Sequence, residues 1–476
     1  MDRHPAIIDG QDTEGEGWIE VVDPATGAPF AELAAGGAAQ VDAAVTAARR
    51  AQPAWAGTPA SGRARVLRRL SGLIAARRDA LAAIECRDTG KPLRQAYADV
   101  DVAARYLEFY AGAVETLYGD TMIPSAGHLA YTLREPFGVT GHIVPWNYPL
   151  QISARTVAPA IAAGNCAVLK PAEEAALGPL AMARLAHEAG LPAGVLNVVP
   201  GRGQDAGAAL AAHTGIDHLS FTGSSEVGRL VTVAAAAQHI PVVLELGGKS
   251  PNIVFADADL DAAVPMITNA ILQNAGQTCS AGSRLLVQSS LHAELVERLA
   301  GTFAAVRIGR GADDPDLGPL ISAGQRDRVQ RMVGAAVEGG AGRLVHGGGV
   351  PEGVEAGGFF YAPTLLDDVD PSAEIAREEV FGPVLATSAF EDEDHAVALA
   401  NGTDYGLIAA VWTRDVGRAH RMAAAVQAGQ VFVNTYGAGG GVELPFGGVK
   451  RSGHGREKGL EGLVAYTQTK SVVVRL

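Results

Sequence analysis

The chain is organised around Asn274-Ala-Gly-Gln-Thr-Cys279-Ser-Ala-Gly282, a stretch that sets a cysteine among small residues. It lies between a predicted helix at about residues 260–273 and a predicted strand at about residues 283–288. Small neighbours leave the sulfur uncovered, so the Cys279 thiol can face a cleft, as a reactive thiol must. Most free cysteines are buried as small hydrophobic residues, so the interpretation depends on other groups in the chain.

Two further polar side chains stand where predicted strands end. Glu245 follows an apolar strand in Leu244-Glu245-Leu246-Gly247-Gly248-Lys249-Ser250-Pro251, and Asn147 is held between prolines in Pro145-Trp146-Asn147-Tyr148-Pro149. A buried carboxylate costs desolvation energy unless it is paired or functional. A thiol, a carboxylate and an amide are the nucleophile, the base for water and the oxyanion donor that acyl chemistry needs.

These segments resemble the aldehyde dehydrogenase superfamily, in its hydrolytic NAD(P)-dependent class, over nearly the whole chain. The matching segments follow the family's order: Pro145-Trp146-Asn147-Tyr148-Pro149, Lys170-Pro171-Ala172-Glu173, Phe221-Thr222-Gly223-Ser224, Glu245-Leu246-Gly247-Gly248-Lys249, Gly276-Gln277-Thr278-Cys279, Glu379-Val380-Phe381-Gly382-Pro383 and Pro445-Phe446-Gly447-Gly448. Each segment alone is weak evidence, but their common order makes coincidence a poor explanation.

Strand and helix patterns alternate along most of the chain. Apolar strands at about residues 139–144, 165–169, 195–199, 217–221 and 241–245, separated by Ala-rich helices, predict a doubly wound parallel sheet. Helices are predicted at about residues 38–51, 62–87 and 92–117, and short strands with turns at 17–35. A second alternating set, at 252–434, predicts a separate α/β domain that holds Cys279.

The expected fold is α/β, with a small β oligomerisation arm beside the two larger domains. We assign residues 1–117 and 137–246 to the NAD-binding domain, 247–455 to the catalytic domain, and 118–136 with 456–476 to the arm. The resemblance implies that the segment from Tyr466 to Val474 pairs across subunits, in a homodimer or homotetramer. An exposed strand edge of this kind requires a partner.

The cofactor is expected to bind where a strand gives way to a helix at Phe221-Thr-Gly223-Ser224, because the first amides of a helix favour phosphate. A glycine run at 201–206 is discounted, since it lacks the acidic residue of a dinucleotide fingerprint. Glu173 should repel a 2′-phosphate, so NAD is expected in preference to NADP. The resemblance implies cofactor contacts from Trp146, Lys170, Glu173, Phe221, Gly223, Ser224, Glu379 and Phe381.

The resemblance also assigns the catalytic roles. Cys279 attacks the aldehyde, Asn147 and the Cys279 backbone amide hold the oxyanion, and Glu245 activates the water that hydrolyses the thioester. Glu457 aligns with a secondary acidic residue that assists proton transfer, although a Glu after an Arg is more often part of an ion pair.

The substrate tunnel is the least defined part of the prediction. The resemblance places Tyr148, Gln151, Ile152, Arg155, Gln273, Thr278, Ser280 and the segment from Val442 to Phe446 around it. Arg155 could grip a substrate carboxylate or form a structural salt bridge, and a second arginine is absent at Gln273. A carboxylated semialdehyde, or another polar or aromatic aldehyde, is therefore expected. Betaine aldehyde is disfavoured, because these positions supply no aromatic cage.

Composition limits the other functions. The net charge of −14 argues against nucleic-acid binding, and no segment has the apolar length of a signal peptide or membrane span. Three cysteines are too few for a disulfide framework, and Cys86 and Cys166 read as structural. We expect a cytoplasmic protein without a metal site.

Three alternative functions fit the residues less well. A CoA-acylating relative typically lacks an acidic residue at the position of Glu245. A catalytically silent structural or binding member of the fold need not keep Cys279, Glu245 and Asn147 together. A cofactor-free thiol hydrolase requires a histidine paired with the cysteine, and it leaves the predicted cofactor residues unexplained.

Overall fold

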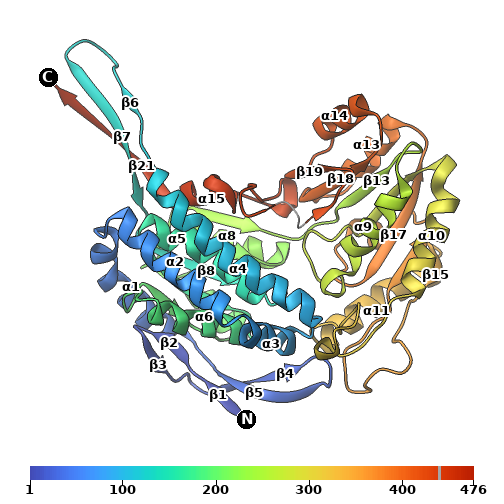
Figure 1. Cartoon of the computed structure of the whole chain (residues 1–476), viewed down its shortest axis with the longest axis horizontal. Helices are drawn as coiled ribbons and strands as arrows, with labels where there is room; N and C mark the ends of the chain where they lie inside the picture. The colour runs from blue at the N-terminus through green and yellow to red at the C-terminus, as the bar shows by residue number, and fades with distance from the viewer. Residues whose placement is uncertain (438–440) are drawn as a thin grey trace.

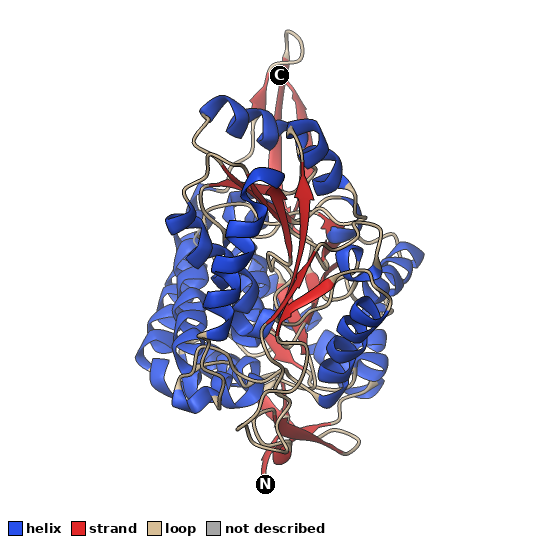
Figure 2. Cartoon of the chain, turned by 90° about the vertical axis from the view of Figure 1, so that its right-hand side faces the viewer, coloured by secondary structure: helices blue, strands red, loops and turns tan. Residues whose placement is uncertain are grey.

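The computed structural model describes residues 1–437 and 441–476. Its β-strands form two large sheets and two three-stranded ones, and Figure 2 shows helices on both sides of the central strands. This confirms the expected fold class. Among the described residues, no helix combines the length and the apolar character that a membrane span requires.

The first large sheet carries the predicted parallel strands in its centre. Its order is β20(Gly453–His454), β12(Val242–Glu245), β11(His218–Thr222), β8(Val139–Val144), β9(Cys166–Pro171), β10(Leu196–Val198), β2(Ala6–Ile8) and β3(Gln11–Thr13). The strands from β12 to β10 are parallel, whereas β20, β2 and β3 are antiparallel edges. The strand order reverses between β8 and β11, and ligands of such sheets bind at the carboxyl ends of the strands beside this point.

Helices cover this sheet on both faces. They are α1(Ala38–Ala56), α2(Ala60–Ala76), α3(Arg78–Thr89), α4(Leu93–Ala113), α5(Pro149–Ala163), α6(Leu177–Glu188), α7(Ala208–Ala211), α8(Ser225–Ala237) and the short turns η1(Val114–Thr116) and η2(Gly203–Gly207). The single helix expected at about residues 62–87 is two helices, α2 and α3. Arg77, with φ −105° and ψ 19°, breaks the chain between them, and the apolar pattern that continues across the break hides it.

The second large sheet lies in the other half of the molecule (Figure 1). Its order is β15(Arg343–His346), β16(Thr364–Asp367), β17(Val384–Phe390), β14(Arg284–Gln288), β13(Pro251–Val254), β18(Ile408–Trp412) and β19(Gln430–Val433), parallel except for β15. Its helices and turns are α9(Leu260–Leu272), η3(Gln273–Gly276), η4(Ser289–Leu291), α10(His292–Ala304), η5(Gly311–Asp313), α11(Ala323–Glu338), α12(Glu374–Arg377), α13(Glu393–Asn401), α14(Val416–Ala425) and η7(Lys450–Ser452). The last helix, α15(Gly459–Val464), returns to the first half and packs on α5 and α4.

The two three-stranded sheets lie at opposite ends of the molecule (Figure 1). One, near the N-terminus, has the order β1(Asp2–His4), β5(Ala28–Ala34) and β4(Trp18–Asp23). The other projects from the body as an arm of β21(Thr467–Arg475), β7(His128–Pro136) and β6(Thr121–Met122). Within one chain, β21 pairs antiparallel with β7. β21 is an outer strand of this sheet, so the expected pairing across subunits would use its other edge.

Candidate active site

The loop of Cys279 turns sharply out of α9. Asn274 and Ala275 adopt left-handed conformations, with φ 50° and 54°, which end the helix. Gly276, with φ 72°, packs so closely that a Cβ atom there would lie 2.1 Å from the Gly382 carbonyl oxygen. The half-buried Cys279 follows in a turn whose next carbonyl, that of Ser280, accepts a 2.8 Å hydrogen bond from the Tyr436 hydroxyl. The thiol is therefore held by backbone geometry that a larger residue at position 276 would disrupt.

The Asn147 side chain is bound to this loop from the end of β8. Its Nδ2 donates to the Gln277 carbonyl oxygen at 2.9 Å, which leaves its second amide hydrogen for another acceptor. Its backbone carbonyl oxygen accepts from Asn274 Nδ2 and from Lys91 Nζ, each at 2.9 Å. The amide predicted to hold an oxyanion is thus fixed from both sides next to Cys279.

Glu245 ends β12 in a fully buried position. The residue is 2% exposed, and neither carboxyl oxygen has a hydrogen-bond partner among the described residues. Burial, and after it the charge of Glu457, raises the pKa of Glu245 well above its ordinary value. Gly447 leaves room for this carboxyl, since a Cβ there would lie 2.7 Å from Glu245 Oε1.

The turn after Glu245 brings its strand against the cysteine loop. A Cβ atom on Gly248 would lie 2.5 Å from the Cys279 carbonyl oxygen, so only glycine permits this approach. Burial is the main cause that raises the pKa of the Cys279 thiol to about 12. The charge of Glu245 is close enough to raise this pKa further. The thiol, amide and carboxyl predicted from sequence are therefore neighbours.

Glu457 pairs with Arg155 and not with its sequence neighbour Arg456. Glu457 Oε2 lies 2.5 Å from Arg155 Nε, and both side chains are almost completely buried. Glu457 Oε1 accepts from Ser220 Oγ at 3.1 Å, and Arg155 Nη2 donates to Thr222 Oγ1 at 3.3 Å. Of the two roles considered for Arg155, the structure shows the salt bridge; its contact with substrate stays a prediction.

A cavity of about 420 Å³ opens beside Cys279. Tyr148 in its wall donates to or accepts from Thr278 Oγ1 at 2.7 Å. The predicted tunnel residues that line this cavity are Tyr148, Gln151, Ile152, Arg155, Gln273, Thr278, Ser280, Val442 and Phe446. The residues predicted to form the tunnel thus line one cavity. Their contacts with a substrate stay a prediction.

The predicted cofactor residues gather at the carboxyl edge of the first sheet. Lys170 Nζ forms a 2.9 Å ion pair with Glu173 Oε2, and Glu173 Oε1 accepts from the Gly203 amide at 3.3 Å. Ser224 caps α8, its hydroxyl accepting from the Val227 amide at 3.3 Å. The glycine run at 201–206 therefore borders the predicted cofactor residues through Gly203.

A second group of predicted cofactor residues comes from the other half of the chain. Glu379 Oε1 accepts from the Gly248 amide at 3.1 Å, and burial raises the pKa of Glu379 to about 7. Phe381, at φ 58°, packs edge to face on Trp146 with ring centroids 5.3 Å apart. These residues join the two halves of the chain beside the loop of Cys279.

Sequence reasoning missed two lysines at the site. Lys91 Nζ is completely buried and pairs with Asp99 Oδ2 at 2.5 Å and Glu85 Oε1 at 3.2 Å while holding the Asn147 carbonyl. The sequence feature that could have identified Lys91 is its place between Gly90 and Pro92, where the chain breaks between two helices. Lys458, directly after Glu457, lines the cavity. The sequence feature that could have identified Lys458 is its place directly after Glu457, a predicted catalytic acid.

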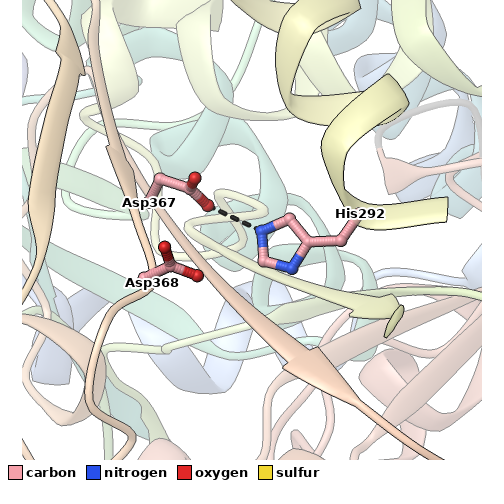
Figure 3. Close-up of side chains that lie close together, drawn as sticks. All are labelled: His292, Asp367 and Asp368. Carbon is pink, nitrogen blue, oxygen red and sulfur yellow. Dashed lines mark hydrogen bonds and ion pairs between the residues drawn. The ribbon is translucent and has the colours of Figure 1, made fainter. Parts of the chain in front are cut away.

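Figure 3 shows a cluster of His292, Asp367 and Asp368 where β16 ends in the second sheet. His292 Nε2 lies 2.6 Å from Asp367 Oδ1, which also accepts from Thr387 Oγ1 at 2.7 Å, and Arg343 Nη2 lies 2.5 Å from Asp367 Oδ2. Both Asp367 oxygens thus have partners within the chain. The cluster is a salt-bridge network that joins α10 to β16.

Comparison with known proteins agrees with this geometry. A sequence model of the aldehyde dehydrogenase family matches residues 11–472. A Burkholderia cenocepacia protein classed as an aldehyde dehydrogenase is 56% identical, with 99% of each chain covered and a TM-score of 0.97.

Two further solved structures are similar over nearly their whole lengths. PnpE from Pseudomonas sp. WBC-3 is 40% identical, with 100% of this chain and 98% of that chain covered and a TM-score of 0.97. PnpE has also been solved in complex with nicotinamide adenine dinucleotide. Betaine aldehyde dehydrogenase from Staphylococcus aureus, in complex with NAD+, is 35% identical, with 99% and 94% covered and a TM-score of 0.97.

Proposed function

Because this chain belongs to the aldehyde dehydrogenase family, we propose that it oxidises an aldehyde to its carboxylic acid with NAD, through a thioester on Cys279. One observation carries the proposal: Cys279 lies on a cavity wall, with the Asn147 amide bonded to its loop and the Glu245 carboxyl within electrostatic reach of its sulfur. The proposed substrates are polar or aromatic aldehydes, including carboxylated semialdehydes.

The first step forms a bond between the Cys279 sulfur and the aldehyde carbon. Burial raises the pKa of Cys279 to about 12, so the thiol must lose its proton to solvent water before the sulfur attacks. Glu245 takes no part in this step. The aldehyde oxygen becomes an oxyanion, which the free hydrogen of Asn147 Nδ2 and the Cys279 backbone N–H stabilise.

The carboxyl edge of the first sheet fits a dinucleotide. The unpaired amides that begin α8 suit its phosphates, the Lys170–Glu173 pair its adenosine ribose, and Glu379 with Phe381 its nicotinamide end. NAD bound there supplies the acceptor for the hydrogen and electron pair that leave the aldehyde carbon. Glu173 also supports NAD over NADP, because its carboxylate repels a 2′-phosphate at the ribose.

The second step releases the acid. Ionised Glu245 takes a proton from water, whose oxygen attacks the thioester carbon, and the Cys279 sulfur leaves as thiolate. The Asn147 amide stabilises the oxyanion again. Glu457 acts through charge: it neutralises Arg155 and raises the pKa of Glu245, which makes Glu245 a stronger base when it is ionised.

We also propose a homo-oligomer that works in the cytoplasm. Val227, Leu230 and Val233 form an exposed apolar stripe along α8, and the arm exposes Val473 and Leu476. Contiguous apolar surface of this kind marks protein contacts. Reducing conditions in the cytoplasm would keep the thiol of Cys279 free for catalysis.

The test follows NADH absorbance across aliphatic, aromatic, amino and carboxylated aldehydes. We expect turnover by the wild type and by Cys86→Ala, which removes a buried cysteine outside the cavity, and a loss of at least about a thousandfold in Cys279→Ala. Turnover by Cys279→Ala at the wild-type rate would refute the mechanism.

A further inference from the structure

The charges around the substrate cavity do not balance. Two of its carboxylates have partners, since Asp99 Oδ2 lies 2.5 Å from Lys91 Nζ and Glu443 Oε1 lies 2.5 Å from Arg105 Nη2. Among the cations, Arg155 is paired with Glu457.

Lys458 is the cation that remains. It lines the same cavity as Cys279, and its ammonium has no ion pair or hydrogen bond with any described residue. Residues 438–440, which lie outside the described part, are Ala-Gly-Gly and have no acidic side chain. A single positive charge therefore faces the space that the substrate occupies.

The backbone holds Lys458 in this position at a cost. Its φ of 61° and ψ of 173° fall in a region that is essentially restricted to glycine, and such strain costs about 1–3 kcal/mol. Backbone hydrogen bonds enforce the conformation on both sides: Glu457 and Phe446 exchange two, at 2.7 and 2.8 Å, and the Gly459 amide donates to the Val442 carbonyl at 2.8 Å. A lysine kept where glycine would be unstrained indicates a use for its side chain.

The Phe446 ring contacts both cations. Lys458 Nζ is 4.9 Å from its centroid and Arg155 Cζ is 5.4 Å from it. This contact orients the Lys458 stem along an aromatic wall of the cavity, but it does not neutralise the ammonium.

We propose that Lys458 binds a carboxylate at the far end of the aldehyde, so that the preferred substrates are ω-carboxylated semialdehydes. This proposal rests on the proposed function and narrows its substrate class. One ammonium matches a monoanion, and Arg155 adds no second site because Glu457 occupies it. Lys458 is thus a specificity residue, while Arg155 supports the wall behind it.

The pKa of Lys458 gives the proposal a pH signature. Burial first, and then the charge of Arg155, lower this pKa to about 8, while Cys279, Glu457 and Glu245 act in the opposite direction. The free ammonium loses its charge as the pH rises through about 8, so selectivity for a carboxylate should decline there. A bound carboxylate raises the pKa and moves this decline to higher pH.

The activity test pairs each acidic aldehyde with a neutral one. Succinic, glutaric and adipic semialdehydes are compared with aldehydes in which an isopropyl group replaces the carboxylate. We expect Lys458→Met to raise KM for the best semialdehyde by about ten- to a hundredfold and to leave KM for the neutral aldehydes unchanged. The charge of Lys458 also lowers the pKa of Glu245, so its loss should change kcat, and by the same factor for acidic and neutral aldehydes. Lys458→Gly should lose the same selectivity while its thermal midpoint stays level or rises, because the strain is relieved.

Lys450→Gly is the matched control. Lys450 also has a positive φ, of 57°, but its Nζ donates to the Asn401 and Thr403 carbonyl oxygens away from the cavity. Its replacement should leave the semialdehyde preference unchanged. No preference for any semialdehyde in the wild type, or an equal rise in KM for acidic and neutral aldehydes in Lys458→Met, would overturn the proposal.

A second measurement separates this proposal from the dehydrogenase activity. Adipate and glutarate should slow the alkylation of Cys279 by iodoacetamide in the wild type but not in Lys458→Met, as followed by peptide mass spectrometry without NAD. If the dicarboxylates protect Cys279 from alkylation but the protein oxidises no aldehyde, the proposed function is wrong and the anion site is supported. Equal alkylation with and without the dicarboxylates would sink the anion site even if aldehydes are oxidised.

Discussion

At the scale of single residues, the chemistry depends on two groups whose protonated forms are favoured by burial. Burial raises the pKa of both Cys279 and Glu245, so each gains its reactive, ionised form only as the pH rises. We therefore predict that kcat/KM for a neutral aldehyde rises continuously from neutral pH into the alkaline range. If kcat/KM no longer changes with pH above neutral pH, both Cys279 and Glu245 are already ionised there, and the prediction is wrong.

A single substitution should move this profile. Glu457→Gln removes a negative charge that raises the pKa of Glu245, and it frees Arg155, whose charge lowers the pKa of both Glu245 and Cys279. The rising limb should shift to lower pH. Glu443→Gln, which changes a carboxylate paired with exposed Arg105 at the cavity rim, is the control and should leave the limb in place. Identical shifts in both variants would mean that net charge alone is responsible.

The residues that sequence could predict are those set by local patterns. Cys279 and Asn147 stand in short segments of small residues or prolines, and Glu245 ends an apolar strand, so each can be recognised where it occurs. The partner of Glu457 could not be found in this way. Arg155 lies far away in the chain, and only the fold brings the two side chains to 2.5 Å.

At the scale of elements, long apolar strands were predictable and short edges were not. All of β9 is buried, as its continuous apolar sequence indicates. By contrast β2, β3 and β20 are two or three residues long, too short to show any period. β2 and β20 pair with the edges that β10 and β12 offer, and β3 pairs in turn with β2.

The buried lysine that links α4 to the site gives a test at this scale. Lys91→Met leaves the Glu85 and Asp99 carboxylates without their cation, and breaking a buried pair costs about 3–5 kcal/mol. We predict a lower denaturant midpoint and a lower kcat, because the Asn147 carbonyl also loses its donor.

Lys470→Met is the control for this change. It removes an exposed pair with Glu135 on the arm, which contributes about 0–1 kcal/mol. A Lys91→Met protein with the midpoint and kcat of Lys470→Met would show that the buried network does not support the site.

At the scale of the whole molecule, the exposed apolar stripe on α8 predicts self-association. Leu230 is 54% exposed and Val233 60% exposed, without cover from the rest of the chain. Leu230→Lys should lower the mass measured by sedimentation, since a charge in an apolar interface is costly to bury. Val416→Lys, which changes a similarly exposed residue on α14, should keep the wild-type mass. If both variants keep that mass, α8 is not an interface.

The central claim is that Glu245 hydrolyses a thioester formed on Cys279, and its most direct test is a single-turnover measurement with Glu245→Gln. Glutamine is neutral, like the protonated carboxyl that burial favours here, so the site should keep its shape. The account predicts a burst of about one NADH per active site, then a stall, with Cys279 heavier by the mass of the aldehyde less that of H2. Sustained wild-type turnover, or a burst without an adduct on Cys279, would contradict it.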